Sequence, residues 1–198
     1  MSEITAAAVA QLREMTGAGM MDAKKALVES AGDLEKAADA LRKSGIVKAG
    51  KKADRVTNEG RVHSYIHGGG KVGALVEVLC ETDFVARNEA FVAFCNDLAM
   101  HIAASAPLYV SRDEVPVELV EKEKEIYKGE MEGQTKSQEV MDKIIEGKLN
   151  KFFADVCLLE QSFIKDEDKT VEEFVKGKIA TLGENIQVRR FSRLNLGA

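Results

Sequence analysis

The segment Glu81–Asn88 contains the residues of this chain with the clearest potential to act on another molecule. It reads Glu-Thr-Asp-Phe-Val-Ala-Arg-Asn, so one aromatic residue, Phe84, stands among polar ones where a loop is expected. An aromatic side chain that served the core would be expected inside an apolar strand or helix. We therefore expect Phe84 to project into solvent, where its ring could contact a partner.

Histidines and cysteines could bind a metal or act as catalysts, but their spacing supports neither role. His63 and His67 fall on one face of an expected strand, about 13 Å apart, which is too far to share a metal unaided. The cysteines occupy apolar stretches without Cys-x-x-Cys spacing, as buried reduced thiols do; they are Cys80, Cys95 and Cys157. The sequence has no P-loop, dinucleotide-binding fingerprint or nucleophile elbow. We expect no cofactor, no metal site and no catalytic residues.

Two regular elements must position Phe84. Apolar residues recur with period two before it, which predicts a strand over Val72–Cys80. After it, helical spacing predicts a helix that begins at Asn88, a good N-cap, and carries Phe91, Phe94, Cys95, Leu98 and Ile102. Phe84 is therefore expected on a short, stiff projection that is held at both ends.

The N-terminal residues 1–47 predict a bundle of three short helices. Thr5 and Asp33 are good N-caps for the first and third helices, and Gly17, Gly32 and Gly45 are the expected helix ends. The apolar positions include Val9, Leu12, Met15, Met20, Ala23, Ala26, Leu27, Leu34, Ala38 and Leu41. Because Met20 and Met21 are adjacent on a helix, both cannot face inward, so one should be exposed. Residues 48–56 are basic and rich in small residues, which is typical of a linker.

The remaining residues, 57–198, predict an α+β core. Alternation over 62–66 and the turn Gly68–Gly70 make a β-hairpin with the Val72–Cys80 strand, and residues 186–194 alternate as a third strand. Two helical stripes over about 116–156, interrupted at Gly133, predict a protruding antiparallel helical hairpin. Thr170–Glu173 is a capping box for a further helix that ends at Gly183. Three strands leave open edges, which favours pairing with a second copy, so we expect a homodimer.

Composition excludes several classes of protein. With 45% apolar and 31% charged residues in 198, the chain is typical of a soluble globular protein. The longest apolar run is far shorter than the roughly 20 residues that span a bilayer. A net charge of −5 argues against direct nucleic-acid binding, and residues 113–146 alone carry 11 acidic against 5 basic residues. We expect a cytoplasmic protein that binds neither membranes nor nucleic acid.

Several long motifs, taken together and in order, resemble the bacterial translation elongation factor Ts family. They are Leu12–Leu27, Thr82–Val85, Met100–Ala104 and Gly183–Ile186, and the resemblance covers the whole chain. It implies a guanine-nucleotide exchange factor that binds elongation factor Tu carrying GDP, dislodges Mg²⁺ and promotes GDP release so that GTP can bind. Such a protein acts by binding and is not an enzyme.

The resemblance also implies where the partner binds. The first three helices would form a ubiquitin-associated-like module whose surface includes Arg13, Met20 and Met21. Thr82, Asp83, Phe84 and Val85 would form the segment that dislodges Mg²⁺, and His101 would lie on a helix that also faces the partner. The module would dock on the GTPase domain of elongation factor Tu, and a neighbouring domain would also be contacted. Longer family members carry two copies of the sheet-containing unit. Because this chain carries one copy, two chains could supply what one longer chain supplies.

Two other classes of function would each account for part of the sequence. An adaptor that binds helical or ubiquitin-like partners through residues 1–50 would leave the projecting aromatic residue without a role. An enzyme that used His101 with Cys95 or Cys80 would need a reactive thiol of low pKa, whereas the apolar settings predict unreactive ones.

Overall fold

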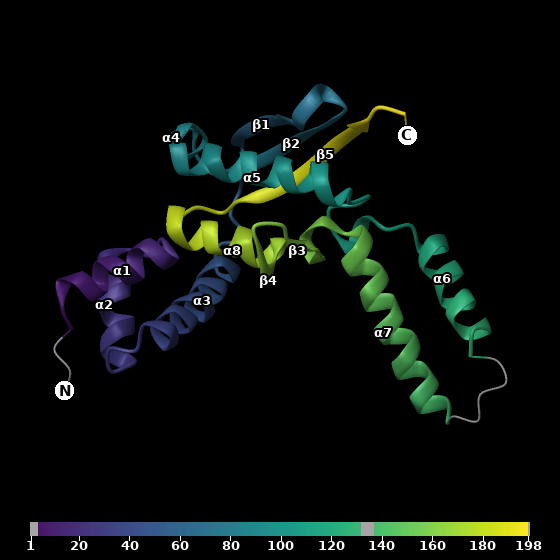
Figure 1. Ribbon diagram of the computed structural model, residues 1–198, viewed down its shortest axis with the longest axis horizontal. Helices are drawn as coiled ribbons and strands as arrows, with labels where there is room; N and C mark the ends of the chain where they lie inside the picture. Colours follow the sequence, from purple (N-terminus) through teal and green to yellow (C-terminus); the bar gives the residue numbers. More distant parts are fainter. Residues whose placement is uncertain (1–3, 132–136, 198) are drawn as a thin grey trace. The chain divides into compact units, whose positions relative to one another are not determined.

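The computed structural model describes residues 4–131 and 137–197 as a mixed helical and sheet protein of the α+β class (Figure 1). The helices are α1 (Ala6–Thr16), α2 (Met20–Glu29), α3 (Leu34–Gly50), α4 (Asp83–Arg87), α5 (Glu89–Ser105), α6 (Val117–Gly129), α7 (Gln138–Val156) and α8 (Val171–Leu182). The strands are β1 (Glu59–Ile66), β2 (Val72–Cys80), β3 (Ser162–Phe163), β4 (Asp166–Thr170) and β5 (Gln187–Asn195). Short 3₁₀ turns cover Gly68–Gly70, Arg112–Glu114 and Leu158–Glu160.

The chain divides into two compact units. The first comprises Met1–His63, Glu77–Cys95 and Glu173–Val188, and the second comprises Ser64–Val76, Asn96–Glu172 and Arg189–Ala198. Several elements pass from one unit into the other, among them β1, β2 and α5. The three-stranded sheet has the order β1-β2-β5, so β1 and β5 are its edges. The edge positions of β1 and β5 agree with the open edges expected from the sequence.

In the first unit, α1, α2 and α3 pack around a small shared core (Figure 1). Its buried residues are Val9, Leu12, Ala23, Ala26, Leu27 and Ala37. The expected caps form: Thr5 accepts from the Ala8 N–H, Asp33 accepts from the Lys36 N–H, and Gly17 ends α1 at a φ of 67°. Met15 was expected among the core residues, but its side chain is exposed.

α3 continues through Gly45 to Gly50, so the expected helix end at Gly45 was wrong. Gly45 is buried, and a β-carbon there would lie 3.3 Å from the β-carbon of Ala180 in α8. This glycine therefore permits close packing of α3 on α8 and does not terminate the helix. The same two helices are joined by an ion pair between Arg42 and Glu173 at 3.0 Å.

The inner face of β2 is buried at alternate positions, as its period-two pattern predicts; these are Ala74, Val76, Val78 and Cys80. β1 approaches β2 closely at Gly60, whose φ is 153°. A β-carbon at Gly60 would fall well inside contact distance of the Val78 carbonyl oxygen, so only glycine fits there.

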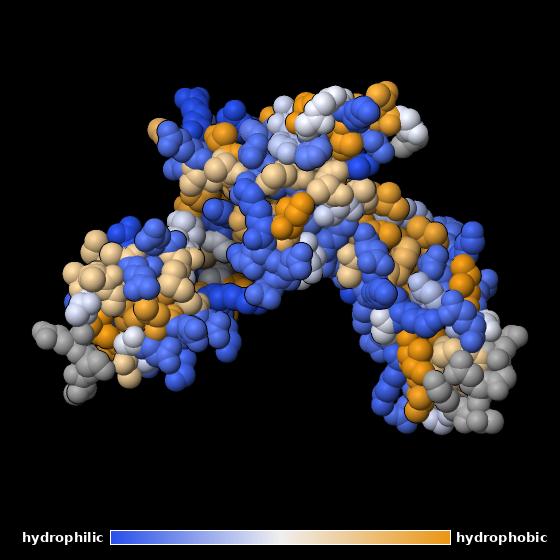
Figure 2. Space-filling view, viewed as in Figure 1, coloured by the Kyte–Doolittle hydropathy of each residue, from blue (hydrophilic) through white to orange (hydrophobic). Residues whose placement is uncertain are grey.

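In the second unit, α6 and α7 pack together around Met131, Ile145 and Leu149. Figure 1 shows the two helices running in opposite directions, and Figure 2 shows hydrophobic side chains gathered along them between hydrophilic ones. The expected interruption at Gly133 lies outside the described residues. The hairpin of β3 and β4 was not expected from the sequence. None of the helices in the described ranges is long and apolar enough to cross a membrane.

Candidate functional site

Phe84 lies on α4, a helix of five residues between β2 and α5. The segment was expected to be a loop; it is helical because the Thr82 side chain caps it, accepting from the Val85 N–H at 3.4 Å. Ala86 is buried beneath the helix, whereas the Phe84 side chain is 84% exposed. The structure therefore agrees with the prediction of an exposed aromatic ring on a short, anchored projection.

The other residues of the segment support α4 in different ways. Asp83 does not cap the helix but pairs with Arg87 one turn later, at 3.0 Å. Val85 is half-buried. On the far side, the Asn88 side chain accepts from the Ala90 N–H at 2.8 Å, so the expected cap of α5 is present. The start of α4 is thus capped by the Thr82 side chain, and its end is closed by the Asn88 N–H, which donates to the Val85 carbonyl oxygen at 3.0 Å.

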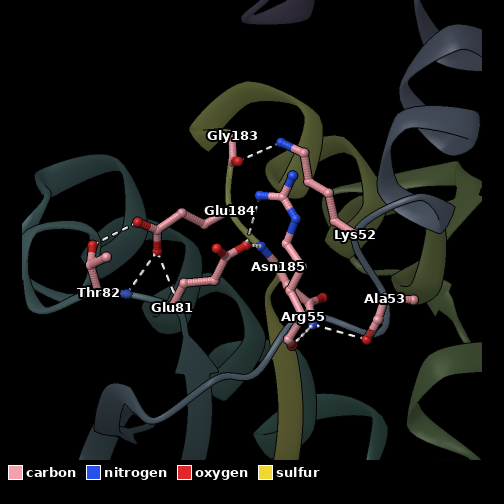
Figure 3. Close-up of polar contacts among 8 residues, drawn as sticks. All are labelled: Lys52, Ala53, Arg55, Glu81, Thr82, Gly183, Glu184 and Asn185. Atoms are coloured by element: carbon pink, nitrogen blue, oxygen red, sulfur yellow. Dashed lines mark hydrogen bonds and ion pairs between the residues drawn. The ribbon is translucent and has the colours of Figure 1, made fainter.

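A turn after α8 binds the base of α4 directly (Figure 3). One carboxylate oxygen of Glu184 accepts from the backbone N–H groups of Glu81 and Thr82, each at 3.0 Å. The other oxygen accepts from the Thr82 hydroxyl at 2.6 Å. The Glu81 carboxylate in turn accepts from the Asn185 N–H at 2.6 Å. The sequence alone marks Gly183–Ile186 as a motif and Gly183 as a helix end, but it indicates no role for Glu184 or Asn185.

The same turn also binds the segment that follows α3. The Asn185 side-chain amide donates to the carbonyl oxygens of Ala53 and Arg55, at 3.1 and 2.8 Å. Lys52 donates to the carbonyl oxygen of Gly183. Figure 3 shows that these residues come from three separate stretches of chain that meet at one point. Asn185 is 2% exposed, so its polar groups are buried and satisfied here.

The N-terminal helices present a second apolar surface. Met15, Met20 and Met21, which we call the methionine corner, are 57%, 61% and 76% exposed and flank the turn between α1 and α2. Arg13 supports this turn by donating from Nε to the Ala18 carbonyl oxygen at 3.3 Å. Methionine side chains are flexible and polarizable, which suits them to contacts with a partner. Both Met20 and Met21 are exposed, where the helical pattern required only one.

His101 is completely buried in the second unit, so its side chain is not available to touch a partner. Its Nδ1 accepts from the Ile164 N–H at 3.2 Å, which leaves Nε2 protonated and donating to Gln161 Oε1 at 2.9 Å. The Gln161 side-chain amide in turn donates a hydrogen bond to the Asp155 carbonyl oxygen at 2.8 Å. His101 therefore joins α5 to the segment around β3, which is a structural role.

Burial lowers the pKa of His101, and the opposing effect of its bond to Gln161 is smaller. Because the folded state resists the proton, the neutral ring's contribution to stability is complete above the ordinary pKa near 6.5. It is lost as pH falls from that value through the lower pKa of the folded state. Denaturant unfolding at pH 7.5 and 5.5 should show wild type losing up to about 1.4 kcal/mol per pH unit more than His101→Gln. Equal losses in both proteins would contradict this prediction.

The thiols are unsuited to catalysis. All three cysteines are free and buried, as expected. Burial raises the pKa of Cys80 to about 11, that of Cys95 to about 12 and that of Cys157 to about 11. Thiolates are therefore scarce at neutral pH, which speaks against the enzyme alternative. No group of metal-ligating side chains was found in the part of the chain that the structure describes.

Known proteins resemble this chain along almost its whole length. A family model described as Elongation factor TS matches residues 46–178. A relative from Geobacter sulfurreducens named Elongation factor Ts is 59% identical over 194 residues, which cover 98% of this chain and 90% of the relative. The chain belongs to the elongation factor Ts family. Elongation factor Ts proteins of Geobacter metallireducens and Acetivibrio thermocellus are 61% and 55% identical over the same shares of each chain.

Membership of the elongation factor Ts family implies a nucleotide-exchange role on elongation factor Tu in translation. A factor of this kind works by binding, so its important residues are exposed contact groups and the groups that hold them. The matched segment 46–178 contains α4, and the full-length relatives also cover the methionine corner and the turn after α8.

Proposed function

We propose that this chain binds elongation factor Tu carrying GDP, dislodges its Mg²⁺ and so promotes GDP release, after which GTP can bind. The observation that carries the proposal is the 84% exposure of Phe84 on a helix whose base is anchored by Glu184. A benzyl group held in water without a role in its own core is available for burial in a partner. Asp83 and Val85, beside it, would complete the contact.

The energetics require that the contact exist in one state of the partner only. A ligand shifts an equilibrium by its differential affinity for the two states, so equal binding to both would accelerate nothing. Burying the Phe84 ring contributes about 1.5–3 kcal/mol. If the burial occurs only with the metal-free, distorted partner, this amounts to about a tenfold to hundredfold fall in GDP affinity. By linkage, returning nucleotide weakens the complex equally, and the factor leaves.

Stopped-flow release of fluorescent GDP from elongation factor Tu tests this function. Added protein should accelerate release until the rate saturates, and excess Mg²⁺ should oppose the acceleration. GDP release at the unaided rate over the whole titration would refute the proposal.

The three-helix module, 1–47, is proposed to be ubiquitin-associated-like and to dock on the GTPase domain through the methionine corner and Arg13. Residues 48–56, of which 48–50 form the end of α3, would connect it to the α+β domain, 57–198, whose hairpin over about 116–156 would protrude. Docking would place the factor on its partner, and the Phe84 contact, which we call the wedge, would promote GDP release. The exchange reaction would take place in the cytoplasm.

Replacing Met20 and Met21 together by serine should weaken binding to elongation factor Tu by about tenfold or more, since two exposed apolar side chains lose their burial. Because both are exposed, the melting temperature should barely change. Titration calorimetry gives the affinity, and Val28→Ser, another exposed position of α2, is the matched control. Wild-type affinity of the double variant would exclude the methionine corner from the interface.

A homodimer is proposed to complete the partner-binding surface, because the chain carries a single sheet-containing unit. In the second unit, Ile66, Leu75, Leu194 and Leu196 are exposed. Leu75 lies within β2, Ile66 and Leu194 lie near the ends of β1 and β5, and Leu196 follows β5. Exposed apolar residues on a sheet with two open edges favour pairing with another copy.

A further inference from the structure

The turn Gly183–Asn185 belongs to one of the sequence motifs, and the proposed function as stated so far does not use it. We propose that Glu184 is a positioning residue for exchange, which sets the pose of α4 and thereby aims Phe84 at the partner. The proposal rests on the proposed function, because it concerns how the Phe84 contact is made ready. It concerns residues of the first unit only, and Figure 3 shows them together.

The chemistry of the junction calls for a carboxylate. Backbone N–H groups at the end of a strand and the start of a helix lie outside both hydrogen-bonding patterns and need another acceptor. Glu184 accepts both of them, from Glu81 and Thr82, with one oxygen, and it accepts the Thr82 hydroxyl with the other. Hydrogen bonds to an ionised acceptor are among the stronger ones in proteins.

The Thr82 hydroxyl carries this restraint into α4. It donates to Glu184 and accepts from the Val85 N–H, so both of its hydrogen-bonding roles are used at once. The direction of the cap is therefore set by Glu184. Phe84 sits between the two residues that this hydroxyl joins, Thr82 and Val85, and its ring direction follows the orientation of the first turn.

Asn185 makes the turn a rigid support. Its backbone N–H bonds the Glu81 carboxylate, and its buried amide bonds the carbonyl oxygens of Ala53 and Arg55. The turn thus holds the base of α4 and the chain segment that leads from the three-helix module into β1. Glu184 is fixed before the partner arrives, so α4 need not be ordered during binding.

Loss of Glu184 should leave the ring in place but poorly aimed. The other supports of α4, which are the buried Ala86 and the Asn88 cap of the next helix, would remain. The helix would then sample several poses, and the affinity for the distorted partner would fall by the fraction of molecules in the competent pose. Loss of Glu184 would slow GDP release only through the orientation of Phe84. In a protein without the Phe84 ring, it should therefore have no further effect.

A double-mutant cycle on GDP release by stopped flow tests this. Glu184→Ala should slow release at saturation by about threefold to thirtyfold. In a Phe84→Ala background the same change should have less than about a twofold further effect, because residues that act through one contact are not additive. Additive effects, or wild-type rates for Glu184→Ala, would overturn the proposal. Wild-type rates for Phe84→Ala would instead refute the wedge, and the positioning role with it.

Two further variants separate aiming from folding. Glu184→Gln keeps an acceptor oxygen for the two N–H groups, so it should fold and should promote GDP release from elongation factor Tu at an intermediate rate. A rate equal to that with Glu184→Ala would count against the proposal. Glu160→Gln is the matched control. In wild type, both carboxylate oxygens of Glu160 accept hydrogen bonds from Arg112. Neither residue belongs to the junction between Glu184 and α4, so the exchange rate should be unchanged.

A spectroscopic measurement on the protein alone addresses the pose directly. The chain has no tryptophan, so Phe84→Trp introduces a single indole on α4. Adding Glu184→Ala should increase the fast local component of its fluorescence anisotropy decay, whereas adding Glu160→Gln should not. An unchanged decay with Glu184→Ala would show that the carboxylate does not restrain α4.

Discussion

Phe84→Ala should slow GDP release from elongation factor Tu by about tenfold to hundredfold while leaving the free protein as stable as wild type. The ring is 84% exposed, so its removal takes almost nothing from the protein's own core. It takes about 1.5–3 kcal/mol from the complex, if the ring is sheltered there. The effects on stability and on the GDP release rate are separable, because the ring is exposed in the free protein and is expected to be buried only in the complex.

Stopped-flow release at saturating factor measures the rate, and thermal unfolding measures the stability. Leu108→Ala is the matched control, since Leu108 is also exposed and lies outside the segments assigned to the partner. Phe84→Leu should fall between alanine and wild type, because it retains part of the apolar area. An unchanged rate for Phe84→Ala would remove α4 from the mechanism.

The second large effect concerns the sheet. Leu75→Arg should convert a dimer into a monomer, because a charge would have to be buried at the centre of an apolar interface without a partner, at a cost of several kcal/mol. Light scattering at micromolar concentration should give twice the chain mass for wild type and the single chain mass for the variant. Leu108→Arg should remain dimeric. A monomeric wild type would refute the dimer outright.

Local signals in the sequence predicted much of the fold. Alternation over Val72–Cys80 identified β2 and its buried face, and Thr5, Asp33 and Asn88 marked helix starts that the structure confirms. These signals depend on neighbours within a few residues, so a single sequence is enough to interpret them. The exposure of Phe84 followed in the same way, from an aromatic residue in a polar setting.

The predictions from sequence were wrong or missing where the local structure depends on residues far away in the sequence. Gly45 resembles a helix end, but it is small because Ala180 packs against it, and no local pattern announces that contact. β4 is composed of charged residues and threonine, Asp166–Thr170, which gives it no apolar alternation. His101 lies on a helix with a regular apolar pattern, but its ring is buried and bonds Gln161, sixty residues later in the sequence.

The support of the candidate site was also invisible in the sequence. Glu184 and Thr82 are separated by 102 residues, and their hydrogen bonds leave no periodic trace. Sequence patterns could nominate the aromatic ring that acts, whereas only the three-dimensional arrangement shows what holds it.

The most direct test compares the affinity of wild type and Phe84→Ala for two forms of elongation factor Tu, the nucleotide-free form and the form loaded with GDP and Mg²⁺. Titration calorimetry should show affinity for the nucleotide-free form falling by about tenfold to hundredfold, and affinity for the loaded form changing by less than about twofold. Equal losses for both forms would contradict the proposal, because a ring that binds both states alike cannot drive GDP out.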